Sequence, residues 1–152
     1  MVLEKEADLT DIQEISSDGQ SLWIRQSDSI SHVTPTLITE YDTPAKVTAV
    51  APAGLTVCVG TEDGLFRFWK GRDQQWEDLL GSQDHDVRIT VTLGDKDGGC
   101  WMAAEDGTIG HITASGEQQW WHLPEPDPPT ITRLIPDHNG MWVLTEEGSW
   151  FI

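Results

Sequence analysis

The sequence predicts an all-β fold of the β-propeller type, with about four blades of four antiparallel strands each. Three observations predict it. A unit of turn, apolar run, polar turn and second apolar run occurs four times, and the i, i+3, i+4 stripes that a helical solenoid needs are absent. Taking Trp23, Cys58, Trp101 and Trp142 as equivalent, the steps along the chain are 58 − 23 = 35, 101 − 58 = 43 and 142 − 101 = 41. A period of about 40 residues with several short strands per unit is typical of propeller blades.

Each unit is expected to supply its strands in the same order. The first strands are predicted at 11–16, 46–51, 87–93 and 130–135, and Thr, Val and Ile dominate the last three. The second strands are predicted around the four equivalent residues, Trp23, Cys58, Trp101 and Trp142. The third strands are predicted at 30–33, 65–69, 109–113 and 149–152, and the fourth at 37–41, 75–79 and 118–123. Proline-bearing joints at 42–45 and 124–129 then lead to the next unit.

The 152 residues are expected to form one domain, with blades at about 9–41, 46–80, 87–123 and 130–152. The fourth unit has three strands, and residues 2–7 are predicted to supply its outer strand; a short helix there is the alternative. Two closures stay open. The chain forms a small four-bladed ring, or it is a half-propeller that completes a larger ring with a second copy or another segment.

The composition is strongly acidic. Twenty-six Asp and Glu residues against nine Lys and Arg give a net charge of −17, which argues against nucleic-acid and membrane partners and favours a basic protein partner. No apolar run approaches the ~20 residues of a transmembrane helix. No signal peptide is visible at the amino terminus, so a cytoplasmic protein is expected.

The two cysteines occupy neighbouring register positions. Cys58 aligns with the tryptophans, whereas Cys100 aligns one place earlier, with Leu22, Val57 and Met141. Adjacent places on a strand point to opposite faces, so the two thiols are expected to stay apart, buried and unpaired. Neither CxxC nor HxxxH occurs, so no structural zinc site is predicted.

A resemblance follows from the repeats. The stretches "CWMAAEDGTIGHITASGEQQWWHLP" and "SISHVTPTLITEYDTPAKVTAVAP" resemble the repeat of virginiamycin B lyase-like propellers. "DKDGGCW" is similar to repeats of two-component regulator propellers, and "WEDLL" at 76–80 is similar to tectonin repeats. The lyase resemblance implies a closed seven-bladed ring with catalytic His and Glu residues and a divalent metal. Only four units are present here, and no His–Glu arrangement matches position by position, so no catalytic residue is predicted.

Acidic residues recur in the second turn of each unit. The sequence places there Asp28, Glu62, Asp63, Glu105, Asp106, Glu146 and Glu147. Equivalent propeller loops share one face, so these carboxylates could bind Ca²⁺ or Mg²⁺ or a basic partner; solvated hairpin turns are the alternative. The run at 95–99 resembles a calcium loop but lacks the distal Glu of an EF-hand, so a turn is predicted.

The eight tryptophans divide into two sets. Trp23, Trp101 and Trp142 share one register position and are expected to pack between blades, as are His32 and His111. The others recur less regularly, and four of them are predicted to form a partner-binding surface on outer strands: Trp69, Trp76, Trp120 and Trp121.

These features favour a non-catalytic protein-interaction or scaffold module that uses rim loops and outer-strand tryptophans. Two alternatives stay open. One is a metal-dependent, lyase-like enzyme, implied by the repeat resemblance. The other is a ligand-sensing propeller segment of a larger receptor, implied by the regulator-type repeats. A homodimer that completes a larger propeller is compatible with all three.

Overall fold

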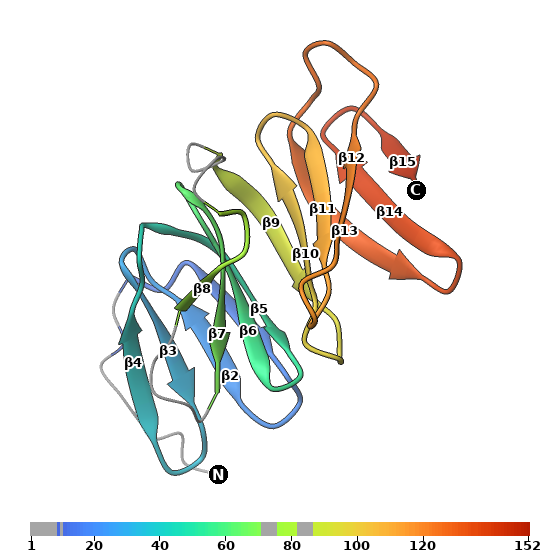
Figure 1. Ribbon diagram of the computed structural model, residues 1–152. Coiled ribbons are helices and arrows are strands. Elements are labelled where there is room, and N and C mark those ends of the chain that lie inside the picture. The colour runs from blue at the N-terminus through green and yellow to red at the C-terminus, as the bar shows by residue number, and fades with distance from the viewer. Residues whose placement is uncertain (1–8, 10, 71–75, 82–86) are drawn as a thin grey trace, which may run out of the picture.

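The structure, a computed structural model, describes residues 9, 11–70, 76–81 and 87–152. These residues form four antiparallel sheets without a helix, which we call blades 1 to 4 (Figure 1). The described part of the chain therefore contains no helix long and apolar enough to cross a bilayer. The all-β, propeller-type prediction is confirmed.

The strands follow one another in sequence order within each blade. Blade 1 comprises β1 (Glu14–Ser17), β2 (Leu22–Arg25), β3 (Ser29–Val33) and β4 (Ile38–Asp42). Blade 2 comprises β5 (Val47–Ala53), β6 (Thr56–Thr61), β7 (Gly64–Trp69) and β8 (Trp76–Asp78). Blade 3 comprises β9 (Ile89–Gly94), β10 (Cys100–Ala104), β11 (Thr108–Ile112) and β12 (Gln118–His122). Blade 4 comprises β13 (Ile131–Asp137), β14 (Gly140–Thr145) and β15 (Ser149–Phe151).

Most predicted strands lie within two residues of the observed ones, and the largest shift is at the start of β1. That strand begins at Glu14 rather than at Asp11, because Asp11 has a φ of 57°, in the left-handed region that a strand does not use. The predicted outer strand at 2–7 lies outside the described residues. Within them, blade 4 has three strands.

Each blade has two faces, set by the alternation of side chains along its strands. We call the face that carries Trp23, Cys58, Trp101 or Trp142 the forward face and the opposite one the rear face. The four residues are equivalent in the structure too, since each pairs across to the third strand of its blade in the same register. The register predicted from the repeats is therefore confirmed.

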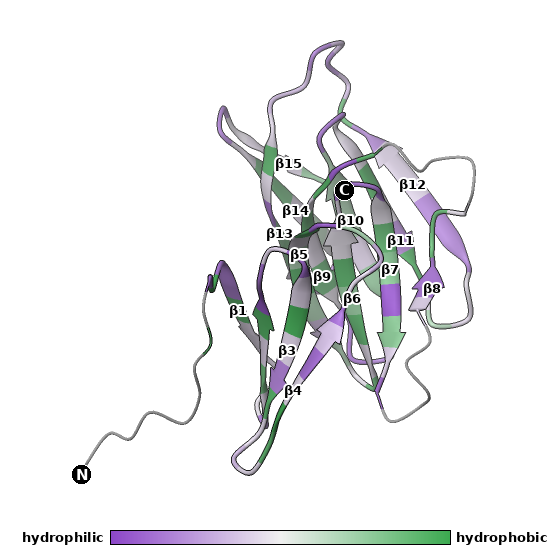
Figure 2. Cartoon of the chain, turned by 90° about the vertical axis from the view of Figure 1, so that its left-hand side faces the viewer, coloured by the Kyte–Doolittle hydropathy of each residue, from purple (hydrophilic) through white to green (hydrophobic). Residues whose placement is uncertain are grey.

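The core consists of three layers, each between the forward face of one blade and the rear face of the next. Trp23 and Ile30 pack against Val57, Val59 and Phe68 between blades 1 and 2. A second cluster lies between blades 2 and 3 and comprises Ala53, Cys58, Leu65, Leu79, Ile89, Cys100, Met102, Ala104 and Ile112. A third lies between blades 3 and 4 and comprises Ala103, Ile109, Leu123, Ile131, Leu134, Met141 and Val143. Figure 2 shows the apolar residues on strands such as β6, whereas the outer strands β8 and β12 are mostly polar.

The first strands of successive blades contact one another along the inner side of the array. Gly94 at the end of β9 allows one of these approaches. A Cβ at this position would lie 2.1 Å from the carbonyl oxygen of Pro52 on β5, so any larger residue would push the two strands apart.

The four blades form an open arc, with blade 1 and blade 4 at its two ends (Figure 1). The sheets pack in chain order, each on the next. Among the described residues no blade follows blade 4, and Trp142 is 39% exposed, contrary to the prediction that it packs between blades. Trp23 and Trp101 do pack between blades, as predicted.

The prediction of unpaired cysteines is wrong, because Cys58 and Cys100 form a disulfide with their Cα atoms 5.8 Å apart. The two residues do occupy opposite faces, as their register indicates. They belong to neighbouring blades, however, and the forward face of blade 2 lies against the rear face of blade 3. Opposite faces of successive blades are the faces that meet, so the offset of one residue brings the sulfur atoms together.

Candidate interaction surface

A pocket of about 480 Å³ opens between blades 2 and 3 on the side of the outer strands. It is lined by Leu80, Val87, Met102, Asp106, Thr108, Trp120, Trp121 and His122. Most of these side chains are apolar, and Asp106 and His122 add polar atoms. A concave, largely apolar surface with a few polar groups is typical of binding sites.

Trp120 is the exposed aromatic residue of this pocket, with 42% of its surface accessible. It lies on β12 opposite Gly110 of β11, and its ring covers the glycine. A Cβ at Gly110 would lie 2.4 Å from Cζ3 of Trp120, so the glycine makes room for the ring. The indole Nε1 donates a hydrogen bond of 3.3 Å to Oε1 of Gln118.

Trp121 follows on the same strand and points to the opposite face. Its ring stacks on that of Trp101, with centroids 5.5 Å apart, and belongs to the layer between blades 3 and 4. Consecutive residues of a strand point to opposite faces, and the two tryptophans do so here. Both line the pocket, but Trp120 alone of the pair is largely exposed.

Trp69 and Trp76 lie outside this pocket. Trp76 packs on Phe68 in the layer between blades 1 and 2, with ring centroids 5.0 Å apart. Trp69 lies beneath the guanidinium group of Arg67, 5.3 Å from its ring centroid, and donates a hydrogen bond to Glu77. The structure thus brings together two of the four tryptophans predicted for partner binding.

The predicted acidic residues occupy four turns at the upper edge of the array in Figure 1. Glu62 lies 3.9 Å from Nζ of Lys46 and 3.2 Å from Nη1 of Arg88. Asp106 accepts the backbone N–H of Thr108 at 2.9 Å, which fits a hairpin turn. In the described part of the chain, no three Asp, Glu, His or Cys side chains gather as a metal site requires. The metal site stays a prediction.

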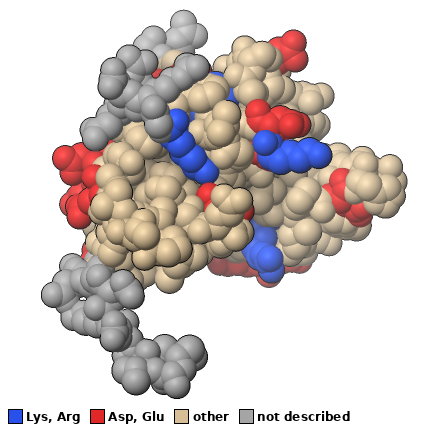
Figure 3. Space-filling view, turned by 90° about the horizontal axis from the view of Figure 1, so that it is seen from below, with Lys and Arg blue, Asp and Glu red and all other residues tan. Residues whose placement is uncertain are grey.

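The lower edge carries a polar arrangement that the sequence analysis missed. In blade 1 the ring of His32 stacks on Trp23 at 4.3 Å, and its Nε2 lies 2.8 Å from Oγ of Ser21. Ser21 donates its hydroxyl proton to Asp18 at 2.9 Å, and Lys70 contacts the same carboxylate at 3.2 Å. Figure 3 shows basic and acidic side chains close together on this end.

Blade 3 repeats the arrangement without the serine. His111 stacks on Trp101 at 4.2 Å, and its Nε2 contacts Asp95 at 3.1 Å. Each histidine lies on the third strand of its blade and pairs directly across from the tryptophan. The recurrence of Trp and His at these positions was the sequence pattern from which the stacked pairs could have been predicted.

Hydrogen bonds explain the electrostatics of the two aspartates. Burial disfavours ionisation of Asp18, but the N–H groups of Gln20 and Ser21 and the contacts with Ser21 and Lys70 outweigh it and lower its pKa far below the usual range. The pKa of Asp95 is also lowered, because its bonds with His111 and two backbone N–H groups outweigh burial. The pKa of His32 is lowered by burial and by the charge of Lys70.

The blade 1 arrangement does not have the order of a catalytic triad. A triad places the carboxylate on the histidine, which then accepts the serine proton. Here the serine gives its single proton to Asp18, so Nε2 of His32 donates to the serine oxygen. These residues therefore close a turn and hold a stacked pair in place.

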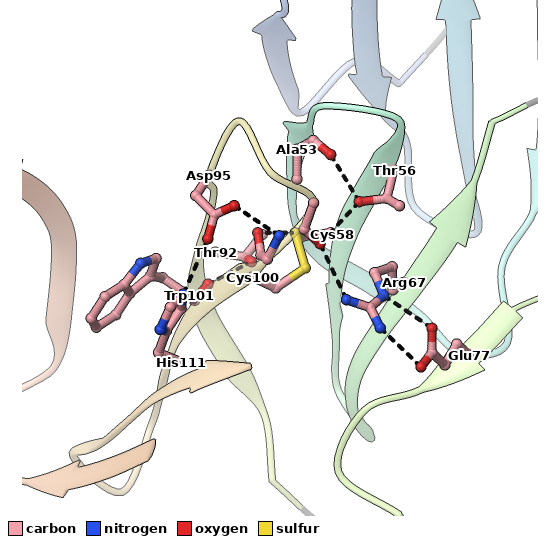
Figure 4. The surroundings of a disulfide bond; sticks show 12 residues. Ala53, Thr56, Cys58, Arg67, Glu77, Thr92, Asp95, Cys100, Trp101 and His111 are labelled. Carbon is pink, nitrogen blue, oxygen red and sulfur yellow. Dashed lines mark hydrogen bonds and ion pairs between the residues drawn. A yellow bond between two sulfur atoms is a disulfide. The ribbon is translucent and has the colours of Figure 1, made fainter. Parts of the chain in front are cut away.

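A buried arginine lies beside the disulfide (Figure 4). Arg67 pairs across from Cys58 and is 1% exposed. Its Nε and Nη2 donate to the two carboxylate oxygens of Glu77 at 3.0 and 2.9 Å, and this bond lowers the pKa of Glu77. Its Nη1 donates to the carbonyl groups of Gly98 and Thr113 in blade 3, each at 3.1 Å. The disulfide and the arginine therefore join blades 2 and 3 at the same place.

No family model and no curated protein matches this chain. Solved structures do match its fold. The computationally designed Ika4 protein is 19% identical with a TM-score of 0.75, and the match covers 100% of this chain and 99% of that one. The extracellular domain of a hybrid two-component system from B. thetaiotaomicron is 19% identical with a TM-score of 0.77, over 98% of this chain and 22% of that one.

A catalytically inactive virginiamycin B lyase from Staphylococcus aureus, with quinupristin, is 16% identical with a TM-score of 0.67. The match covers 98% of this chain and 57% of the lyase. This chain thus spans little more than half of the lyase and about a fifth of that extracellular domain. The predicted resemblance to both kinds of protein is confirmed as a structural one, and identities this low show the fold alone.

Proposed function

We propose that this chain is a non-catalytic protein-interaction module, and that the pocket beside Trp120 receives a basic segment of a partner protein. The observation that carries the proposal is an exposed indole at the rim of an apolar pocket. Tryptophan is enriched among residues that dominate binding energy, because it buries a large area and keeps a polar N–H for a hydrogen bond.

The charge supports a basic partner. The chain carries a net charge of −17, and Asp106 lines the pocket itself. A segment with one large apolar side chain flanked by Lys or Arg would fill the pocket and place its charges near Asp106 and the acidic turns. Such attraction raises the association rate and weakens with salt. No observation on the described residues favours the metal-dependent, lyase-like alternative.

Fluorescence polarisation with labelled peptides tests the proposal. The panel contains short peptides with a central Leu, Phe or Trp flanked by lysines, and matched peptides with glutamate in place of lysine. We expect the basic peptides to bind and the acidic ones not to bind. Trp120→Ala should weaken binding about 30-fold, in line with a dominant tryptophan of about 2 kcal/mol.

Leu55→Ala is the control, because Leu55 is an exposed apolar residue that lies in the turn between β5 and β6 and does not line the pocket. It should leave peptide affinity unchanged. Asp106→Asn should weaken binding less than Trp120→Ala and reduce its dependence on salt. Equal affinity of Trp120→Ala and the wild type, or no binding by any basic peptide, would contradict the proposal.

A further inference from the structure

We infer that a second copy of this chain packs on the two end faces of the arc, so that two chains form one closed ring of eight blades. The end faces are the forward face of blade 4 and the rear face of blade 1. This inference is independent of the pocket beside Trp120, and it rests on the three interfaces that the chain already contains.

Each internal interface brings together the same two register positions. Trp23 of blade 1 and Val57 of blade 2 belong to one core cluster. Cys58 of blade 2 and Cys100 of blade 3 are joined by the disulfide. In the third interface, Trp101 packs against the cluster that contains Met141. In each interface, the forward-face residue of one blade therefore belongs to the same layer as the residue of the next blade that precedes its equivalent.

The fourth such pair is Trp142 on the forward face of blade 4 and Leu22 on the rear face of blade 1. Both are 39% exposed, whereas Trp23 and Val57 at the equivalent places are at most 1% exposed. Because the two faces lie at opposite ends of the arc, this pair cannot form within one chain (Figure 1). In the dimer, each end face contacts the same kind of surface that the equivalent face of an inner blade contacts within the chain.

Several residues around this pair are apolar as well. Ile135 and Phe151 pair across from Trp142 and share the forward face of blade 4, and Phe151 is 46% exposed. On the rear face of blade 1, Ile15 is 57% exposed. Val33 pairs across from Leu22 on this face. Ile24, which pairs across from Ile15, is buried.

The exposed apolar residues concentrate at the two ends. Of the eight large hydrophobic side chains exposed in the described part of the chain, six belong to the end blades or the residues beside their strands: Ile12, Ile15, Leu22, Leu37, Trp142 and Phe151. Trp142 and Phe151 are contiguous, with ring centroids 4.9 Å apart, and contiguous exposed apolar surface marks interaction sites.

Symmetry favours a dimer over an open chain of copies. Two arcs related by a twofold axis place the forward end of each on the rear end of the other, so both ends of both chains are covered. Each chain carries −17, so the dimer carries 2 × (−17) = −34. Mutual repulsion opposes assembly, and we expect salt to strengthen the dimer.

The first test is the mass in solution, by light scattering on a sizing column over a range of chain concentrations. We expect twice the chain mass of 16.9 kDa, with a higher dimer fraction at high than at low NaCl concentration. Leu22→Glu places a charge on one end face, so this variant should elute at 16.9 kDa. Leu55→Glu is the control, because Leu55 is 76% exposed but lies in the turn between β5 and β6.

The second test uses the Cys58–Cys100 pair as a template. Its equivalents in the dimer are residue 142 of one chain and residue 22 of the other. Chains with Trp142→Cys and chains with Leu22→Cys, mixed and mildly oxidised, should give a covalent dimer on non-reducing gels. The native cysteines are already paired, so the added thiols are the free ones. A mixture of the Trp142→Cys and Leu55→Cys chains is the matched control and should stay uncross-linked.

The outcomes separate clearly. A mass of two chains together with the cross-link confirms the ring. A mass of 16.9 kDa at every concentration overturns it and assigns the end faces to another occupant. A dimer without the cross-link overturns the proposed register, and species larger than a dimer in the doubly substituted Leu22→Cys, Trp142→Cys chain overturn closure.

Discussion

Breaking the disulfide between Cys58 and Cys100 is the most informative perturbation of this fold. The bond joins blades 2 and 3, near the middle of the array, and both cysteines are fully buried. Reduction removes a covalent link without removing any side chain. The stability lost on reduction therefore measures the link itself.

The size of the effect follows from the chain length that the bond encloses. Its two ends are 42 residues apart, and in the chain-entropy account such a link lowers the entropy of the unfolded chain by about 13 cal/mol/K. At 25 °C this corresponds to about 4 kcal/mol of stability. A domain of this size is stabilised by about 5–15 kcal/mol in total, so the loss is a large fraction of it.

Urea unfolding followed by tryptophan fluorescence measures this loss, with and without a phosphine reductant. With a urea dependence of about 2 kcal/mol/M, the midpoint should fall by about 2 M on reduction. The double variant with Cys58→Ala and Cys100→Ala is the control. Its midpoint should be low from the start and should not respond to reductant. An unchanged midpoint of the reduced wild type would refute the disulfide.

The disulfide also bears on the expected cytoplasmic location. Stable disulfides are typical of oxidising compartments and rare in the cytosol of mesophiles. A wild-type protein purified from a reducing cytosol should contain two free thiols, whereas protein made in an oxidising compartment should contain none. Thiol titration of the two preparations distinguishes these states.

Four further predictions concern single residues. Arg67→Met should destabilise the protein by about 2–3 kcal/mol in urea unfolding, because two carbonyl groups of blade 3 lose a charged donor. Stability should fall from about pH 6.5 downward, since the lowered pKa of His32 lets the unfolded chain bind its proton first, and His32→Gln should flatten this step. A second fall should follow below about pH 4, where the lowered pKa of Asp18 means that the unfolded chain again takes up the proton first. Gly110→Ala should displace the ring of Trp120, cost about 1 kcal/mol and weaken peptide binding.

Each of these predictions has an opposing result. Wild-type stability of the arginine variant would mean that its bonds to blade 3 do not form in solution. An equal urea midpoint at pH 7.5 and 5.5 would contradict the lowered histidine pKa. An equal urea midpoint at pH 4.5 and 2.5 would contradict the lowered pKa of Asp18. Full peptide affinity of the Gly110→Ala variant would mean that the position of the Trp120 indole does not matter for binding.

The repeat register was predictable because it depends on local patterns. Alternating apolar residues and Asp–Gly turns specify strands and hairpins within each blade, and the equivalence of Trp23 with Trp101 could be read from spacing. Opposite orientation of Trp120 and Trp121 follows from strand geometry alone. The hydrogen-bond partner of His32 could not be predicted, because the shape of a turn brings Ser21 to the imidazole and Asp18 to Ser21.

The sequence by itself determined the fold class, the four units, the approximate positions of the described strands and the face on which their side chains lie. Only the tertiary structure decided which faces meet. Alternation along a strand says that Cys58 and Cys100 occupy opposite faces, but stacking of successive blades places those two faces against each other. The exposure of Trp142 has the same origin, because its register matches that of buried Trp23 and its place at the end of the arc leaves it uncovered. Contacts between sheets depend on how the blades are arranged in space, and no local pattern carries that information.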